Sequence, residues 1–254
     1  MSNFSSLLSA LGFAIIFALI SFLGILLFRF KLFQNNLKYL ISLAAGAMLA
    51  DSFVHILPEA IESNGSFSFG LSLTFLVSIL FSFLIESYFR WRECCALEKK
   101  TSSVNQIQVL GFMNLFGDAW CNFNDGITLV VAFLASPTTG LATGLAILLH
   151  EIPQEIADFG VLIHSGFSSQ KAKLFNFIIS LISILGVFFG YFVIANFPFL
   201  QSYFLTFGAG SITYLALSGL IPEVHKNHQK GFSWKSFLAL IIGIILITLV
   251  KFIE

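Results

Sequence analysis

Residues 146–163 read "AILLHEIPQEIADFGVLI". Both ends of this stretch are as apolar as a membrane helix. Its centre instead carries His150, Glu151, Gln154, Glu155 and Asp158. Residues four apart lie on one face of a helix, so His150 aligns with Gln154. An apolar helix with a polar, acidic centre predicts a functional site buried inside a membrane.

The composition of the whole chain predicts the same setting. Of its 254 residues, 57% are hydrophobic and 10% are charged, whereas an ordinary soluble domain is about a quarter charged. The formal net charge is zero, which leaves no basic patch for nucleic acid. Cys94 and Cys95 are adjacent and Cys121 is the third cysteine, so no disulfide framework is indicated. We therefore expect an all-α polytopic membrane protein whose surroundings are the lipid bilayer.

Eight apolar segments are each long enough to cross a hydrocarbon core, which needs about 20 helical residues. They are residues 4–28, 38–61, 67–90, 106–135, 138–166, 171–196, 199–222 and 234–253. Helices are expected because a bilayer offers backbone groups no hydrogen-bond partner. The connections are short, so we expect residues 1–254 to form a single transmembrane domain.

Lysine and arginine are concentrated on one side of this arrangement. The first, third, fifth and seventh loops, with the segment ends that flank them, contain all of the 13 lysines and arginines except Lys251. Basic loops stay in the cytoplasm. The sequence therefore predicts eight transmembrane helices with both termini outside, in a plasma membrane or a bacterial inner membrane.

Two stretches resemble each other although they are expected to run in opposite directions. Residues 45–59 read "AGAMLADSFVHILPE" and residues 209–223 read "AGSITYLALSGLIPE", with Ala-Gly and Pro-Glu at the same spacing. This similarity predicts an inverted repeat, which is typical of secondary transporters with a site near the membrane midplane. A chance match between two apolar helices is the alternative.

The fourth segment supplies polar side chains at the depth of the first stretch. "GDAWCNFNDG", residues 117–126, places Asp118, Asn122 and Asp125 on one face, with Cys121 one turn from Asp125. The fourth and fifth segments are antiparallel, so both polar stretches fall near mid-membrane. A charge there costs at least ~2.5–3.5 kcal/mol, and no lysine or arginine occurs in the middle of a span. His, Cys and carboxylate groups bind zinc and its neighbours, so we predict a divalent metal site.

Other features of these two segments leave alternatives open. Pro153 lacks a backbone donor, and we expect it to open the helix beside the candidate ligands. Asp118 and Asp158 have an alternative role as protonated, hydrogen-bonded packing residues. Gly186 and Gly190 are expected to let helices pack closely.

With "CNFNDG" at 121–126 and "HEIPQEIADF" at 150–159, the sequence is similar to the ZIP family of divalent metal transporters. "HILPEA" at 55–60 and the Pro-Glu near the end of the seventh segment extend the resemblance over the whole chain. The family implies uptake of zinc, or of iron, manganese or cadmium, into the cytoplasm as substrate, with no organic cofactor. It also implies a homodimer and an elevator-like movement of a metal-carrying helix bundle against segments two and seven.

The resemblance further implies a two-metal site. By position, one metal would be held by Cys121, Asp125, His150 and Gln154. Its neighbour would be held by Asn122, Asp125, Glu151 and Glu155. The family usually has histidine in place of Cys121, many members have a second histidine in place of Gln154, and Ala157 replaces a glycine. The two ligand changes bear on metal preference.

Ionisable residues near the ends of segments two and seven are candidate stations for a moving cation. His55 and Glu59 lie at the expected outer end, and Glu223, His225 and His164 lie at the inner edge. Solvated charges at helix ends are the alternative.

Two other functions are weighed against transport. His150 and Glu151 begin like the "HExxH" motif of zinc proteases, but Gln154 is a poor zinc ligand, so we do not expect an enzyme such as an intramembrane hydrolase. A metal sensor or a transport-inactive relative is the other alternative, because ligand positions are substituted.

Overall fold

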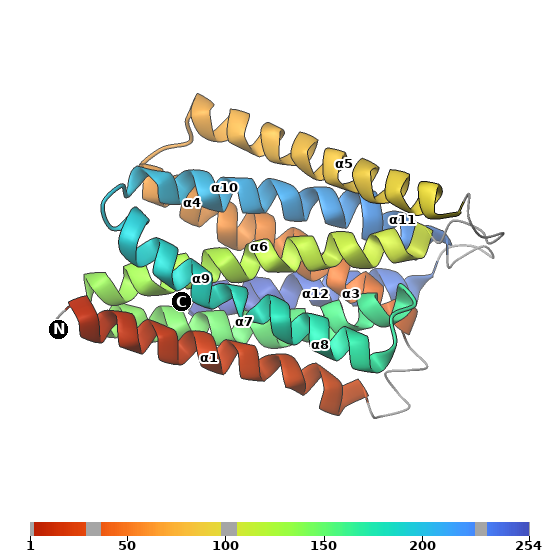
Figure 1. Cartoon of the computed structure of the whole chain (residues 1–254), viewed down its shortest axis with the longest axis horizontal. Helices are drawn as coiled ribbons and strands as arrows, with labels where there is room; N and C mark the ends of the chain where they lie inside the picture. The colour runs from red at the N-terminus through yellow and green to blue at the C-terminus, as the bar shows by residue number, and fades with distance from the viewer. Residues whose placement is uncertain (1–2, 29–36, 98–105, 227–232, 254) are drawn as a thin grey trace.

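The computed structural model describes residues 3–28, 37–97, 106–226 and 233–253, with a smaller set of side chains that leaves out those of His150 and Pro153. Within these residues the chain is helical apart from short turns, and it contains no strand. The helices lie side by side in one elongated bundle (Figure 1). The predicted all-α class is confirmed for the described part of the chain.

Five of the predicted segments are single helices in the described chain. These are α1 (Asn3–Phe28), α5 (Phe69–Leu97), α6 (Gln106–Ala135), α7 (Pro137–His164) and α12 (Trp234–Ile253). The other three are composite, and each contains a π-helix. They are α3 (Leu37–Ala50) with η1 (Asp51–Ile56) and α4 (Leu57–Asn64); α8 (Ser169–Ser180) with α9 (Ile182–Phe189) and η2 (Gly190–Ile194); and α10 (Phe199–Tyr214) with η3 (Leu215–Leu220) and α11 (Ile221–Lys226).

Local sequence explains where α7 begins and where α4 and α7 end. Ser136 is extended, its hydroxyl accepts a hydrogen bond from the N–H of Thr139 at 3.0 Å, and Pro137 takes the first helical position. Gly65 and Gly166 have φ angles of 79° and 84°, a left-handed conformation that glycine adopts without strain. These residues turn the chain back into the bundle.

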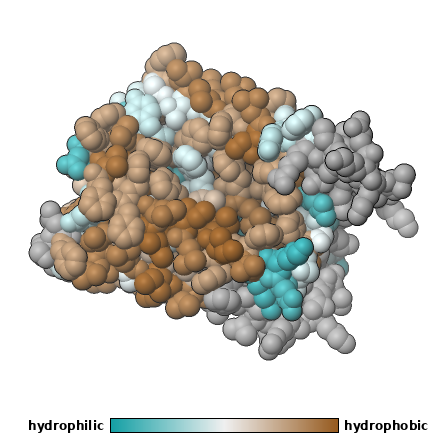
Figure 2. Space-filling view, in the orientation of Figure 1, coloured by the Kyte–Doolittle hydropathy of each residue, from teal (hydrophilic) through white to brown (hydrophobic). Residues whose placement is uncertain are grey.

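Much of the surface is apolar. Figure 2 shows a face that is largely hydrophobic, with hydrophilic patches toward its ends. Within the described residues, the helical segments long and apolar enough to cross a membrane are Tyr39–Asn64, Phe69–Trp91, Ser169–Ile194 and Phe199–His225. Shorter apolar helices are Phe4–Leu19 and Trp234–Leu249. The count of eight spans stays a prediction.

The chain termini and the described lysines of the predicted cytoplasmic loops lie at opposite ends of the bundle. α1 begins and α12 ends at the same end (Figure 1). Lys171 at the start of α8 and Lys235 at the start of α12 belong to the opposite end. Other basic residues of the predicted cytoplasmic loops lie outside the described residues, namely Arg29, Lys31, Lys99, Lys100 and Lys230. The side of the membrane that each end faces stays a prediction.

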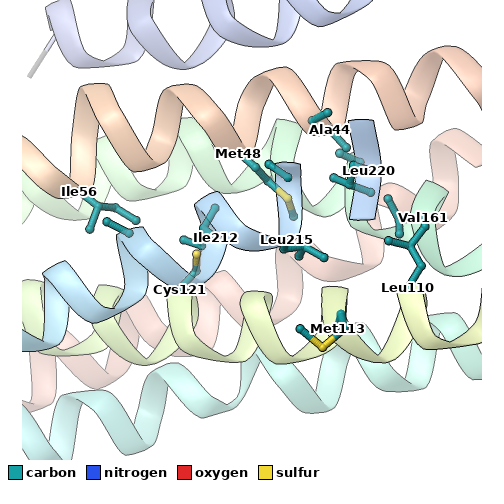
Figure 3. Close-up of a cluster of buried hydrophobic side chains, with 14 of the residues drawn as sticks. Ala44, Met48, Ile56, Leu110, Met113, Cys121, Val161, Ile212, Leu215 and Leu220 are labelled. Atoms are coloured by element: carbon teal, nitrogen blue, oxygen red, sulfur yellow. The ribbon is translucent and has the colours of Figure 1, made fainter. Parts of the chain in front are cut away.

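The helices pack in two groups. The first consists of α1, α6, α7 and the segment α8–α9–η2, and the second of α3–η1–α4, α5, α10–η3–α11 and α12. α3 contacts α7 and α6 contacts α10 across the boundary. A hydrophobic cluster fills this boundary, with Met48 of α3, Leu110 of α6 and Ile212 of α10 among its members (Figure 3). The candidate site lies beside it.

The two similar stretches, 45–59 and 209–223, run in opposite directions. The start of the second segment packs against the end of the first, because α10 contacts α4 while α3 contacts η3 and α11. Both stretches contain a π-helix at the same register, η1 and η3, followed directly by the helix that carries Pro-Glu. Ser52 joins them, since its hydroxyl donates to the carbonyl of Ala209 at 2.7 Å.

Candidate functional site

Two buried carboxyl groups at the interface of α6 and α7 are each paired with an amide. Nδ2 of Asn122 donates to Oδ1 of Asp118 at 2.8 Å, and Nδ2 of Asn114 donates to Oδ1 of Asp158 at 3.0 Å. None of the four side chains is more than 1% exposed. These contacts support a hydrogen-bonded packing role for Asp118 and Asp158. Asn114, one turn before Asp118, extends the polar face of α6 beyond the stretch that the sequence singled out.

Glu155 is held by helix α8. Its Oε2 accepts a hydrogen bond from Nδ2 of Asn176 at 2.8 Å, and its Oε1 accepts one from the hydroxyl of Ser180 at 2.6 Å. A metal at Glu155 would have to compete with these two donors. Neither donor was expected, because segment 171–196 reads as a largely apolar span.

Asp125 and Glu151, both predicted metal ligands, are brought together across α6 and α7. Their side chains form a hydrogen bond, and Glu151 is 1% exposed. Among the described residues, the charged groups that act on Glu151 are all carboxyl groups, those of Asp125, Glu155 and Asp118. Carboxylates so close together in a low dielectric repel one another unless a proton or a cation neutralises them.

Several buried oxygen atoms of this region accept no hydrogen bond from any described residue. They are Oδ2 of Asp118, Oδ1 of Asn122, Oε1 of Glu151 and Oδ2 of Asp158. Buried acceptors are normally satisfied, and an ion is one of the partners that can satisfy them. Carboxylate and amide oxygens are suitable ligands for a divalent cation.

Cys121 projects from α6 into the hydrophobic cluster, where its sulfur lies beside Ile212 (Figure 3). It is 6% exposed. The carboxyl groups of Asp51, Asp125, Asp118 and Glu151 are within electrostatic range of the thiol. Asp51 comes from η1 in the other helix group and was not singled out from the sequence. Its spacing of four from His55 was the available signal.

The remaining predicted ligands are less well defined. Gln154 is 6% exposed on α7, whereas the side chain of His150 lies outside the described residues. Among the described side chains, no three from His, Cys, Asp and Glu are grouped closely enough to hold a metal ion. α7 is helical through residue 153, so the expected opening at Pro153 is not a break in the helix. The two-metal arrangement stays a prediction.

A cavity of about 260 Å³ connects the candidate entrance residues with Asp125. We call it the vestibule. Its lining consists of His55, Glu59, Asp125, Thr128, Thr139, Ala142, Thr143 and Ile147. Glu59 of α4 and the residues from the first half of α7 belong to helical segments that lie toward the end of the bundle at which α1 begins (Figure 1). His55 also binds Asp51, with 3.0 Å between Nδ1 and Oδ1.

The predicted inner residues lie at the opposite end. Nε2 of His164 is 2.9 Å from Oε1 of Glu223, so these two candidates are brought together. Glu223 also lines a smaller cavity of about 50 Å³ with Glu86 and Arg90, which are hydrogen-bonded to each other. His225 is exposed on α11. Glu86 and Arg90 at this cavity were missed, because they read as the polar end of a span.

The chain is similar to known metal transporters. A family model described as "ZIP Zinc transporter" matches residues 92–251. The chain is 31% identical over 229 residues to "Zinc transporter ZIP13" of Pongo abelii, covering 84% of this chain and 66% of the relative. It is 34% identical over 153 residues to "Zinc transporter zipt-7.2" of Caenorhabditis elegans, covering 58% and 33%. It is 33% identical over 134 residues to "Metal cation symporter ZIP14" of Mus musculus, covering 53% and 27%.

The chain thus spans less than two thirds of the length of each of these curated relatives. The family model nevertheless matches more than half of the chain, including both polar helices. Membrane-spanning helices with a polar interior are what a metal transporter requires. The chain belongs to the ZIP zinc transporter family.

Proposed function

We propose that this protein transports divalent metal cations across a membrane, with zinc as the principal substrate. The observation that carries the proposal is the vestibule of about 260 Å³, which leads from His55 and Glu59 to Asp125. The side chain of Asp125 is in turn hydrogen-bonded to that of the buried Glu151. A cavity that ends at carboxyl groups inside a helix bundle suits a cation.

The charge distribution supports a cationic substrate. The acidic side chains between α6 and α7 interact electrostatically with one another. Among the described residues, no positively charged group interacts with Glu151 in this way. A divalent cation arriving at Asp125 would neutralise two carboxylates at once, which offsets the cost of placing them in a low dielectric. Protons and metal ions compete for these carboxylates, because each displaces the other.

We further propose that the substrate moves into the cytoplasm through two neighbouring metal positions. Cys121, Asp125, His150 and Gln154 would form one position. Asn122, Asp125 and Glu151 would form the other, and Glu155 would join it only by releasing α8. A homodimer, and movement of the first helix group against the second, are proposed from the family resemblance.

Metal flux into proteoliposomes tests the proposal. Purified wild-type protein should take up Zn²⁺, and Asp125→Ala should reduce the initial rate at least ~100-fold. Loss of a group that only hydrogen-bonds to a metal ligand already costs about 10–100-fold, and loss of a direct ligand should cost more. Glu62→Ala, at an exposed position of α4 that does not line the vestibule, is the matched control and should transport normally.

The folded state of the Asp125→Ala variant is checked by its thermal unfolding midpoint in detergent, because the apolar substitute removes buried charge as it removes the ligand. Near-normal flux in this variant would place the metal route elsewhere. Zinc binding by the wild type without any flux would instead support a sensor. Cleavage of peptides or lipids by the purified protein would support a hydrolase.

A further inference from the structure

The vestibule has one wall of charged residues and one wall of hydroxyl groups. His55 and Glu59 of η1 and α4 form the first wall. On α7, Thr139, Thr143 and Ile147 are spaced by four, so they form a stripe along one face. The next position of that stripe is Glu151. The stripe therefore leads from the vestibule toward the buried carboxyl groups.

Threonine hydroxyls elsewhere in this bundle bond to their own helix. Thr74, Thr206, Thr213 and Thr248 each donate to the carbonyl oxygen four residues earlier, at 2.7 to 2.9 Å. This local bond is the usual way for a threonine to satisfy its hydroxyl inside a membrane helix. It uses the donor proton of the hydroxyl and fixes its orientation, so the hydroxyl cannot reorient toward a ligand.

Thr128 and Thr143 are different. Both line the vestibule and both are half-buried, yet neither hydroxyl forms a hydrogen bond with any other described residue. Thr139, at the rim, is instead bonded to Ser136, with 2.8 Å between the hydroxyl oxygens. Thr128 lies one turn after Asp125 on α6. The two free hydroxyls thus stand on the two helices that carry Asp125 and Glu151.

We propose that Thr128 and Thr143 guide the partly hydrated divalent cation from His55 and Glu59 to Asp125. A hydroxyl oxygen can accept a hydrogen bond from a metal-bound water or replace that water as a weak ligand. Because it is neutral, it lowers the cost of entering a narrow passage without holding the cation tightly. This role rests on the proposed transport function. In it, Thr128 and Thr143 determine how fast the substrate enters.

The test replaces each hydroxyl by a methyl group of similar shape. Thr128→Val and Thr143→Val together should lower kcat/KM for Zn²⁺ uptake by about tenfold, as expected for the loss of one or two modest hydrogen bonds. The dissociation constant of Zn²⁺ for the purified protein should change less than about twofold, because these residues act along the route and not at the final site. Thr128→Ser with Thr143→Ser should restore uptake.

Thr206→Val is the matched control, since Thr206 is a buried threonine with a local bond to the carbonyl of Ser202 and is not part of the vestibule lining. It should leave kcat/KM unchanged. Equal uptake by the wild type and the double valine variant would overturn the proposal, as would a serine variant that stays as slow as the valine variant.

A second measurement separates failure of this inference from failure of the transport function. In a Cys94→Ser, Cys95→Ser background, Thr143→Cys should react rapidly with a charged thiol reagent and Thr206→Cys should not. If the wild type shows no flux but Thr143→Cys reacts, the transport function fails while the water-filled hydroxyl wall stands. A Thr143→Cys variant that does not react would overturn the inference whatever the flux.

Discussion

At the scale of single residues, the site is organised around Asp125. It lines the vestibule and is hydrogen-bonded to Glu151, so its side chain joins the cavity to the buried carboxyl groups. Cys121 is one turn away on the same helix, within electrostatic range of Asp125. The environment of the predicted metal therefore combines hard oxygen ligands with one soft sulfur. Metal preference should follow the balance between them.

The contribution of Cys121 can be tested by Cys121→His. A thiolate is softer than imidazole, so the substitution should shift selectivity from cadmium toward manganese, by about tenfold or less in relative uptake. Thiolate binding also releases a proton, so uptake by the wild type should weaken more steeply on acidification than uptake by the variant. Competition among zinc, cadmium and manganese across a pH series measures both effects.

Met113→Leu serves as the control for Cys121→His, because Met113 is another buried sulfur-containing residue of the same hydrophobic cluster. It should leave the metal ranking unchanged. If Cys121→His also leaves the ranking unchanged, the thiol is a packing group beside Ile212 and does not bind the metal.

Most acidic residues of the site were predictable from sequence, whereas Asp51 and the hydrogen-bond partners of the carboxyl groups were not. A carboxyl group in the middle of an apolar span stands out by itself, as Asp125 and Glu151 do. An asparagine or serine does not, because its meaning depends on which neighbouring helix it faces. Asn176 and Ser180 illustrate this, since their role follows from the packing of α8 against α7. The rotation of a helix about its axis is set by long-range packing.

At the scale of helices, glycine allows two pairs to approach at backbone distance. A Cβ on Gly46 of α3 would overlap the carbonyl oxygen of Leu240 on α12. A Cβ on Gly186 of α9 would overlap the carbonyl oxygen of Phe123 on α6, which confirms the expected packing role of Gly186. Each pair lies inside one helix group. These close contacts hold α3 against α12 and α9 against α6.

Gly46→Ala should therefore destabilise the protein. The added methyl group has no space, and the obstacle is backbone, so α3 and α12 must move apart; overpacking of this kind typically costs about 1–3 kcal/mol. Gly12→Ala is the matched control, because no atom lies within 4 Å of a Cβ at that position. It should be neutral or slightly stabilising. Thermal unfolding midpoints in detergent compare the two, and an equal midpoint for both variants would contradict the close approach.

Most helix ends were predicted within a few residues, although α5 extends to Leu97, beyond the expected end at residue 90. The π-helices were not predicted. α6 and α12 have the bounds expected from hydropathy, since apolar length is what a membrane selects. In η1, η2 and η3 the number of residues per turn differs from that of an α-helix. The amino-acid composition of these segments does not reveal this difference. η1 and η3 precede Pro58 and Pro222, and a proline removes a backbone donor and disfavours the regular turn before it. The paired prolines were visible in the sequence, whereas the resulting geometry was not.

At the scale of the whole molecule, the matching positions of η1 and η3 support the inverted repeat. The two segments run antiparallel, touch through Ser52 and Ala209, and end in Pro-Glu near opposite ends of the bundle. Glu59 lines the vestibule and Glu223 lines the small cavity at the other end. If the repeat takes part in transport, we expect it to provide an equivalent gate on each side of the membrane, as alternating access requires.

The orientation of the bundle can be tested with the native cysteines. Cys94 and Cys95 belong to α5 beyond Arg90, and their side chains lie outside the described residues. Because the lysines and arginines are concentrated at that end, we expect it to face the cytoplasm. A membrane-impermeant thiol reagent should leave both cysteines unlabelled in intact cells and label them after permeabilisation. Ser66→Cys, in the exposed turn at the opposite end, should be labelled in intact cells when Cys94 and Cys95 are replaced by serine. The reverse pattern would place both termini in the cytoplasm and would make the vestibule the exit of the route.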